Sequence, residues 1–95
     1  MTTQDADASQ NAPAEQLLQR GIAAAGRGAA EEAADWFRKA VALRPDFAAA
    51  QANLGLLLLA LRRHGEAEPH LRIAATLMPR DAALRNALGV AQEAL

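Results

Sequence analysis

The side chains best suited to acid–base chemistry or metal binding are two histidines and a small cluster of carboxylates. His64 and His70 are six residues apart, which is about 240° around a helix, so they cannot chelate one metal ion from a shared face. Glu31, Glu32 and Asp35 could supply a carboxylate pair, but the helix dipole also favours acidic residues at a helix start. We therefore expect structural roles for all five and predict that the chain is not an enzyme.

Other forms of catalysis lack the residues that they need. The chain has no cysteine or tyrosine, and its single serine is Ser9. Gly26-Arg27-Gly28 lacks the preceding strand and the lysine of a phosphate-binding loop. The sequence thus predicts no catalytic residue, no bound metal and no cofactor.

The charge balance argues against nucleic acid and membranes as partners. Ten basic and eleven acidic residues give a net charge of −1, and the basic residues around Arg62-Arg63 are diluted by Glu66 and Glu68. The longest apolar run, residues 54–61, is far shorter than the ~20 residues that span a bilayer. We expect a cytoplasmic protein, and the excess of arginine over lysine, together with abundant alanine, is associated with bacterial sources.

The composition predicts an all-α fold in one small domain. Of the 95 residues, 26 are alanine, which favours helices and is depleted in strands. Residues 1–12 carry no apolar periodicity and are expected to form a disordered lead, followed by a helical domain over 13–95. Five helices are expected, the first from Pro13 to Gly26 and the others over residues 29–43, 47–61, 66–77 and 82–95. Asp46 and Asp81 are the expected N-caps of the third and fifth helices.

The helical region repeats at a constant interval along the chain. Gly21, Gly55 and Gly89 are equally spaced, and Pro45 and Pro79 are separated by the same interval of about 34 residues. Small residues let two helices approach closely, and proline ends a helix, so the recurring types have a structural reason. The alternative is a helical bundle in which the spacing is accidental.

These motifs resemble the tetratricopeptide repeat family, whose unit is about 34 residues long. The first repeat, 14–47, matches with Leu17, Gly21, Ala33, Phe37, Ala40 and Pro45, and the second, 48–81, with Leu54, Gly55, Leu58, Ala67, Leu71, Ala74 and Pro79. A terminal helix, 82–95, contains Leu88 and Gly89. The chain departs from the pattern at four positions. Arg20 and Ala24 replace a leucine and an aromatic residue, and Gln51 and Arg85 stand where tryptophan is expected. The resemblance implies an α-solenoid of antiparallel helix pairs.

The resemblance also implies a concave, mostly apolar groove lined by the first helix of each repeat. Its positions in this chain are Leu18, Gln19 and Ile22 in the first repeat, Asn53, Leu56 and Leu59 in the second, and Asn86 and Val90 in the terminal helix. Leu56 and Leu59 face either this groove or the helical core, and the sequence leaves both interpretations open. Of the five positions that clamp a carboxylate in one subgroup of the family, only Asn53 matches, so that mode of binding is rejected.

The predicted function is a non-catalytic interaction scaffold that binds an apolar peptide or helix, or a second copy of itself. A chaperone-like carrier of a hydrophobic protein and an accessory segment of a larger enzyme are the alternatives. We expect self-association, because two and a half repeats leave apolar surface that a further helix normally covers.

Overall fold

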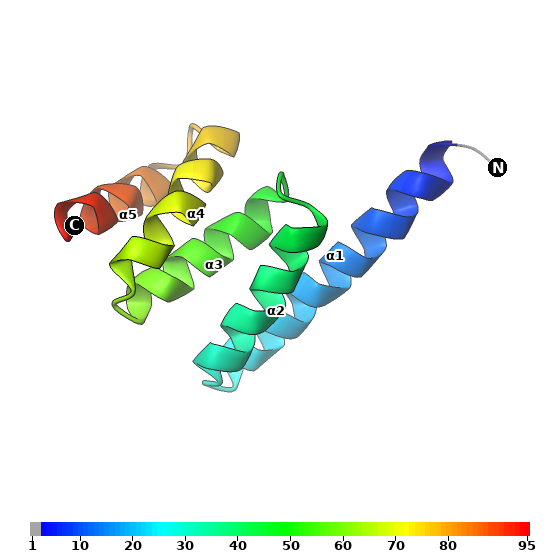
Figure 1. Ribbon diagram of the computed structural model, residues 1–95, viewed down its shortest axis with the longest axis horizontal. Coiled ribbons are helices and arrows are strands. Elements are labelled where there is room, and N and C mark those ends of the chain that lie inside the picture. Colours follow the sequence, from blue (N-terminus) through cyan, green and yellow to red (C-terminus); the bar gives the residue numbers. More distant parts are fainter. Residues whose placement is uncertain (1–2) are drawn as a thin grey trace. The chain divides into compact units, whose positions relative to one another are not determined.

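The protein forms five α-helices over residues 3–95, which are the residues described by this computed structural model, with side chains described from Ala12 onward. The helices are α1 (Thr3–Gly26), α2 (Ala30–Leu43), α3 (Ala48–Ala60), α4 (His64–Leu77) and α5 (Ala82–Glu93), and this part of the chain contains no strand (Figure 1). The all-α prediction is confirmed. The chain divides into two compact units, Met1–Pro45 and Asp46–Leu95.

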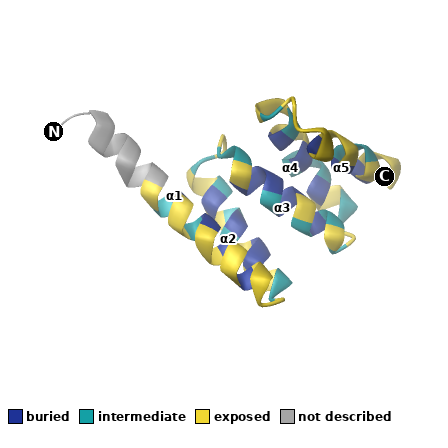
Figure 2. Cartoon of the chain, turned by 180° about the vertical axis from the view of Figure 1, so that it is seen from behind, coloured by how far each residue is buried: buried dark blue, intermediate teal, exposed yellow. Residues whose placement is uncertain are grey.

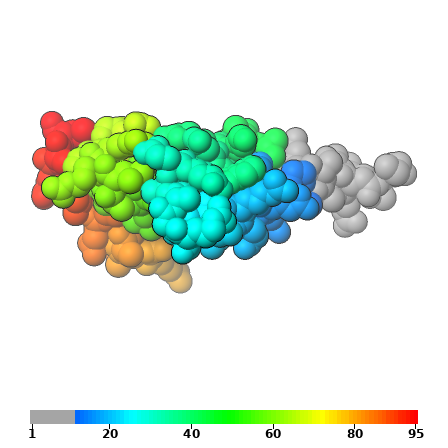
Figure 3. All heavy atoms as spheres, turned by 90° about the horizontal axis from the view of Figure 1, so that it is seen from below, coloured from blue at the N-terminus to red at the C-terminus, as the bar shows by residue number. Residues whose placement is uncertain are grey.

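The first unit is a pair of antiparallel helices, α1 and α2, whose side chains are in contact along the pair (Figure 3). Its key contact joins Gly21 to Phe37. A Cβ atom placed on Gly21 would lie 2.6 Å from Cδ1 of Phe37, so the phenyl ring lies directly against the glycine backbone. The rest of the core is small, consisting of Ala14, Leu18 and Ala24 from α1 and Ala33, Ala34 and Ala40 from α2.

The second unit pairs α3 with α4 and adds α5 against α4. A Cβ atom on Gly55 would lie 2.8 Å from both Cγ and Cδ2 of Leu71 and 3.1 Å from its backbone nitrogen. The helix α3 carries more buried positions than its neighbours, as the continuous apolar run suggests (Figure 2). The largest fully buried side chains of the described residues all lie in this unit, and they are Leu54, Leu58, Leu71 and Leu84.

The repeat period therefore corresponds to one contact that occurs in both units. Phe37 follows Gly21 by the same number of residues as Leu71 follows Gly55, and each large side chain fills the space beside its glycine. The third glycine differs, because a Cβ atom on Gly89 would meet no atom within 4 Å.

The two units also end their first helix in the same way. Gly28 and Arg62 stand at equivalent positions of the two repeats, and both have positive φ, +79° and 65°. In each case the next amide donates back to the helix, Ala29 N to Ala24 O and Arg63 N to Leu58 O, both at 2.9 Å. This is the Schellman arrangement, which requires a left-handed residue. In the second unit an arginine occupies the position that favours glycine.

Some predicted helix boundaries need correction. Phe47, with extended backbone, is the residue at the N-cap of α3, so Asp46 is not its cap. The turn at Arg62 leaves His64 and Gly65 free to begin α4 two residues before the expected start. Asp81 does cap α5, because its Oδ1 accepts a hydrogen bond from the Leu84 amide at 3.2 Å.

The N-terminal helix also begins earlier than expected. Its first residue is Thr3, ten residues before the expected start at Pro13. Met1 and Thr2, and all side chains before Ala12, lie outside the described residues, so the disordered lead over residues 1–12 stays a prediction.

The glycine contacts predict opposite effects of one substitution at two repeat positions. Gly55→Ala should lower the free energy of unfolding by about 1–2 kcal/mol, because the overlap with Leu71 outweighs the better helix propensity of alanine. Gly89→Ala is the matched control and should raise it by about 0.5–1 kcal/mol, since its Cβ meets nothing. Urea unfolding followed by circular dichroism measures both, and equal shifts would contradict the close contact.

The strained turn predicts a stabilising substitution. Arg62→Gly should raise the free energy of unfolding by about 0.5–1 kcal/mol, because glycine adopts positive φ without the steric cost that arginine has there. Gly28→Ala, the reverse change at the equivalent position, should destabilise by about 1 kcal/mol. Thermal melts of both variants test this, and an Arg62→Gly variant that melts below the unmodified chain would contradict it.

Candidate functional site

The first helices of the repeats each expose one large apolar side chain at the same repeat position. These residues are Ile22 on α1, Leu56 on α3 and Val90 on α5, with 45%, 39% and 52% of their areas exposed. Each follows the glycine of its repeat by one residue, and one residue is a rotation of about 100° around a helix. On α1 and α3, where the glycine faces the second helix, the next side chain is therefore rotated away from the core.

The structure separates the two leucines that the sequence left ambiguous. Leu56 is exposed, whereas Leu59 is only half-exposed. Leu59 lies four residues after Gly55, within about 40° of the direction that faces Leu71. Leu56 is therefore an exposed side chain, and Leu59 lies at the margin between surface and core.

The remaining predicted groove residues are distributed unevenly. Gln19 and Asn86 are exposed and Asn53 is half-buried. Leu18 is buried, with 7% of its area exposed, and is part of the apolar core instead of an open surface. Its position corrects the expectation that it would line a groove, because this face of α1 is covered by packing.

The three exposed apolar residues are distributed over the two units. Ile22 belongs to the first unit, whereas Leu56 and Val90 belong to the second, on α3 and α5. Within each unit these side chains are exposed. A continuous concave groove across the repeats stays a prediction.

Sequence reasoning missed a second exposed series at the ends of the second helices. Leu43 closes α2 and Leu77 closes α4, and both are exposed. They stand at equivalent positions of the two repeats, so the repeat period of the sequence already related them to each other. The family pattern places groove positions on the first helix of each repeat, so it gives no signal for the ends of the second helices. Ile73 on α4 is a further exposed apolar side chain.

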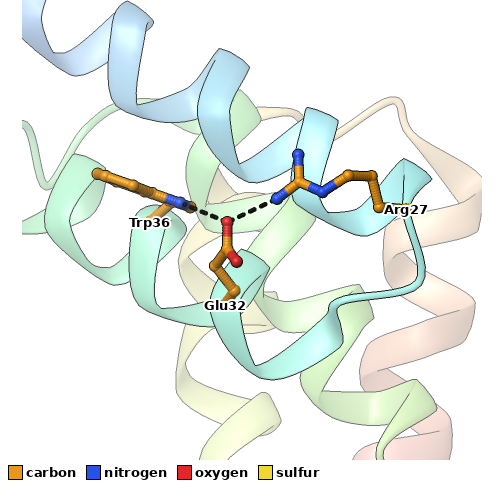
Figure 4. Close-up of polar contacts among 3 residues, drawn as sticks. All are labelled: Arg27, Glu32 and Trp36. Atoms are coloured by element: carbon orange, nitrogen blue, oxygen red, sulfur yellow. Dashed lines mark hydrogen bonds and ion pairs between the residues drawn. The ribbon is translucent and has the colours of Figure 1, made fainter.

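Trp36 is the centre of a polar cluster on the first unit. Its Nε1 donates to Oε2 of Glu32 at 3.3 Å, and Nη2 of Arg27 reaches the same oxygen at 2.7 Å (Figure 4). The guanidinium of Arg20 and the ammonium of Lys39 lie 5.2 Å and 4.7 Å from the ring centroid, within the range of cation–π attraction. These contacts give the half-buried Trp36 a structural role where α2 meets α1.

Two of the three carboxylates considered for catalysis, Glu32 and Asp35, form ion pairs with basic residues. Glu32 pairs with Arg27, and Oδ1 of Asp35 pairs with Nη1 of Arg38 at 3.1 Å. Both pairs are largely exposed to solvent, so each contributes little to stability. Among the described side chains, no three histidine, aspartate or glutamate residues converge to hold a metal ion.

His70 and Gln51 form a polar contact between α4 and α3. Nδ1 of His70 lies 2.8 Å from Oε1 of Gln51, and the amide oxygen can only accept, so the ring nitrogen donates. Gln51 is 3% exposed and stands where the repeat pattern expects tryptophan. This hydrogen bond satisfies the oxygen of the buried Gln51 amide and joins α4 to α3.

An open hollow lies along one side of α1. It has a volume of about 490 Å³ and is lined by Ala12, Glu15, Gln16, Gln19 and Arg20, all from that helix. Because these residues come from one helical face and the hollow is open to solvent, it lacks the enclosed apolar walls of a small-molecule site. No described helix has a stretch of sufficient length and hydropathy to cross a lipid bilayer.

Comparison with solved structures shows a likeness to a chain described as "MamA RS-1 ArsTM double mutant". The TM-score is 0.81 and the sequence identity 34%, over 84% of this chain and 45% of that chain. The chain thus spans less than half of the MamA chain, which is a helical repeat protein of the tetratricopeptide type. No family model and no curated protein sequence matches. The fold is therefore a TPR-like helical repeat.

The absence of cysteine from the sequence allows the exposed series to be tested directly. Single cysteines replacing Ile22, Leu56 or Val90 should react with a maleimide dye at nearly the rate of a free peptide thiol, since these side chains are exposed. Leu54→Cys is the buried control and should react much more slowly. Mass spectrometry of timed samples gives the rates, and protection of Leu56→Cys equal to that of Leu54→Cys would place Leu56 in the core.

Proposed function

From a TPR-like helical repeat fold, we propose that this chain is a non-catalytic protein-interaction module that binds an apolar helix or extended peptide. The observation that supports the proposal is the series Ile22, Leu56 and Val90, one exposed apolar side chain at the same position of each first helix. Helical repeats commonly present such aligned positions to a partner.

The size of the apolar contribution fits a peptide partner. A large aliphatic side chain contributes about 1.5–3 kcal/mol when it is fully buried, and the side chains of the series are already covered over part of their area. Each therefore gains about 1 kcal/mol from a partner. Association also has an entropic cost of several kcal/mol. Three such residues are therefore insufficient alone, and the partner must also contact neighbouring residues.

Polar side chains near the apolar series can form hydrogen bonds with the same peptide. Asn53 and Asn86 lie on the same helices as Leu56 and Val90, and Gln19 lies on α1 with Ile22. Their amides can donate to and accept from a peptide backbone. The proposed ligand is accordingly an apolar segment with an accessible backbone or a polar edge.

Selection and mutation test this proposal together. Peptides selected from a phage-displayed library on the immobilised chain should be enriched in leucine, isoleucine, valine and aromatic residues. Leu56→Glu and Val90→Glu should each weaken a selected peptide by about tenfold or more in fluorescence anisotropy, because a charge would be placed against apolar groups.

The matched control is Ile73→Glu, at an apolar side chain on α4 that is exposed to the same degree as Leu56. It should change the affinity by less than about twofold. Circular dichroism checks that the variants keep their helical content. Peptides without apolar enrichment, or equal loss of affinity in the Ile73 variant, would contradict an interaction surface on the first helices.

A further inference from the structure

One face of α5 has a charge pattern that is complementary to itself. Leu84, Ala87 and Ala91 are buried, and the opposite face, centred on Gly89, carries Arg85, Asn86, Gln92 and Glu93, all exposed. Arg85 precedes Gly89 by four residues and Glu93 follows it by four. We propose that α5 pairs in antiparallel orientation with α5 of a second copy of this chain, about a two-fold axis at Gly89.

The helical geometry brings the opposite charges together. Four residues rotate a helix by about 400°, so both charged residues project within about 40° of the direction of Gly89. Each lies about 6 Å along the axis from Gly89, on opposite sides. In an antiparallel pair centred there, Arg85 of one copy lies at the same height as Glu93 of the other, and the two-fold axis repeats the contact.

The amides reinforce the same arrangement. Asn86 and Gln92 are three residues before and after Gly89, so Gln92 of one copy lies beside Arg85 of the other and Asn86 beside Glu93. The arrangement brings no two like charges together. Reversing the direction of one helix would instead align Arg85 with Arg85 and Glu93 with Glu93. The charges therefore select the antiparallel orientation.

Gly89 supplies the close approach that this pairing needs. The equivalent glycines, Gly21 and Gly55, are each covered by a large side chain of the following helix, whereas nothing lies within 4 Å of a Cβ atom placed on Gly89. Two helices that meet at glycine can approach closely enough for short side chains and ion pairs to interact. A second copy of α5 would cover the glycine of both chains.

The side chain of Arg85 is restrained by a hydrogen bond to the backbone. Its Nη1 donates to the backbone carbonyl of Pro79 at 2.5 Å, which limits the movement of a long side chain on the exposed face. A guanidinium has further N–H groups that remain able to donate to a carboxylate. Restraint of the side chain before association lowers the entropic cost of forming the pair. One contact between 12-residue helices is small, so the dimer is weak and reversible.

Charge reversal gives a specific test. Light scattering after size exclusion of the 95-residue chain, over a roughly hundredfold dilution series, should show a monomer–dimer equilibrium. Arg85→Glu and Glu93→Arg should each raise the dissociation constant by about tenfold or more, since each makes both ion pairs repulsive. A mixture of the two variants should dimerise again, because every contact then joins opposite charges.

The two charge variants distinguish a loss of dimerisation from a loss of helical structure. Arg85→Glu places an acid near the N-terminus of α5 and Glu93→Arg places a base at its C-terminus, which the helix dipole favours, so circular dichroism should show unchanged helicity. Gly89→Leu should also weaken the dimer by about tenfold, because its side chain has space in the single chain but would separate the two helices.

Three results would overturn the proposal. These are a monomer at all concentrations, unchanged dimerisation of either charge variant, and failure of the mixed variants to dimerise. A dimer that Leu56→Glu abolishes and the charge variants leave intact would place self-association on the apolar series instead. Peptide binding by the charge variants reports separately on the proposed function, because Arg85 and Glu93 are not part of that series.

Discussion

The contact between a glycine on the first helix of a repeat and a large side chain on the second helix determines most of this structure. Phe37 fills the space over Gly21 and Leu71 fills the space over Gly55. A chain with so much alanine has few large side chains, so close approach of the backbones is the way to bury them completely. Leu71 is fully buried and Phe37 is 3% exposed, which shows how effectively the two glycines allow this packing.

The same contact fixes which residues remain outside. With Gly21 and Gly55 directed at the second helix, the following residues, Ile22 and Leu56, are rotated away from the core, and both are apolar. Val90 follows Gly89 at the same repeat position and is also exposed, although no side chain covers Gly89. The exposed part of such an apolar side chain does not contribute to the packing of the single chain. This recurrence is the basis of the proposed interaction with a partner.

The two units use one geometry with different side chains. The left-handed turn after the first helix is formed by Gly28 in one unit and Arg62 in the other, with the same hydrogen bonds. Trp36 and His70 also occupy equivalent positions, one under two cations on the surface and the other bonded to a buried glutamine. The two units therefore resemble each other more in backbone geometry than in side-chain chemistry, because the repeat depends on helix spacing and turn shape.

The sequence by itself determined the helices, their order and the residues of the shared contact, because alanine content, proline and the repeat period are local or linear properties. The resemblance to the tetratricopeptide repeat family also placed Ile22, Leu56 and Val90 among the expected groove positions, with Leu56 left open between groove and core. Tertiary structure alone decided that Leu18 is buried while Leu56 is exposed, that Gln51 pairs with His70, and that Gly89 has no side chain against it. These outcomes depend on which side chains a neighbouring helix places beside each residue. The spacing of residues along one helix carries no information about those side chains.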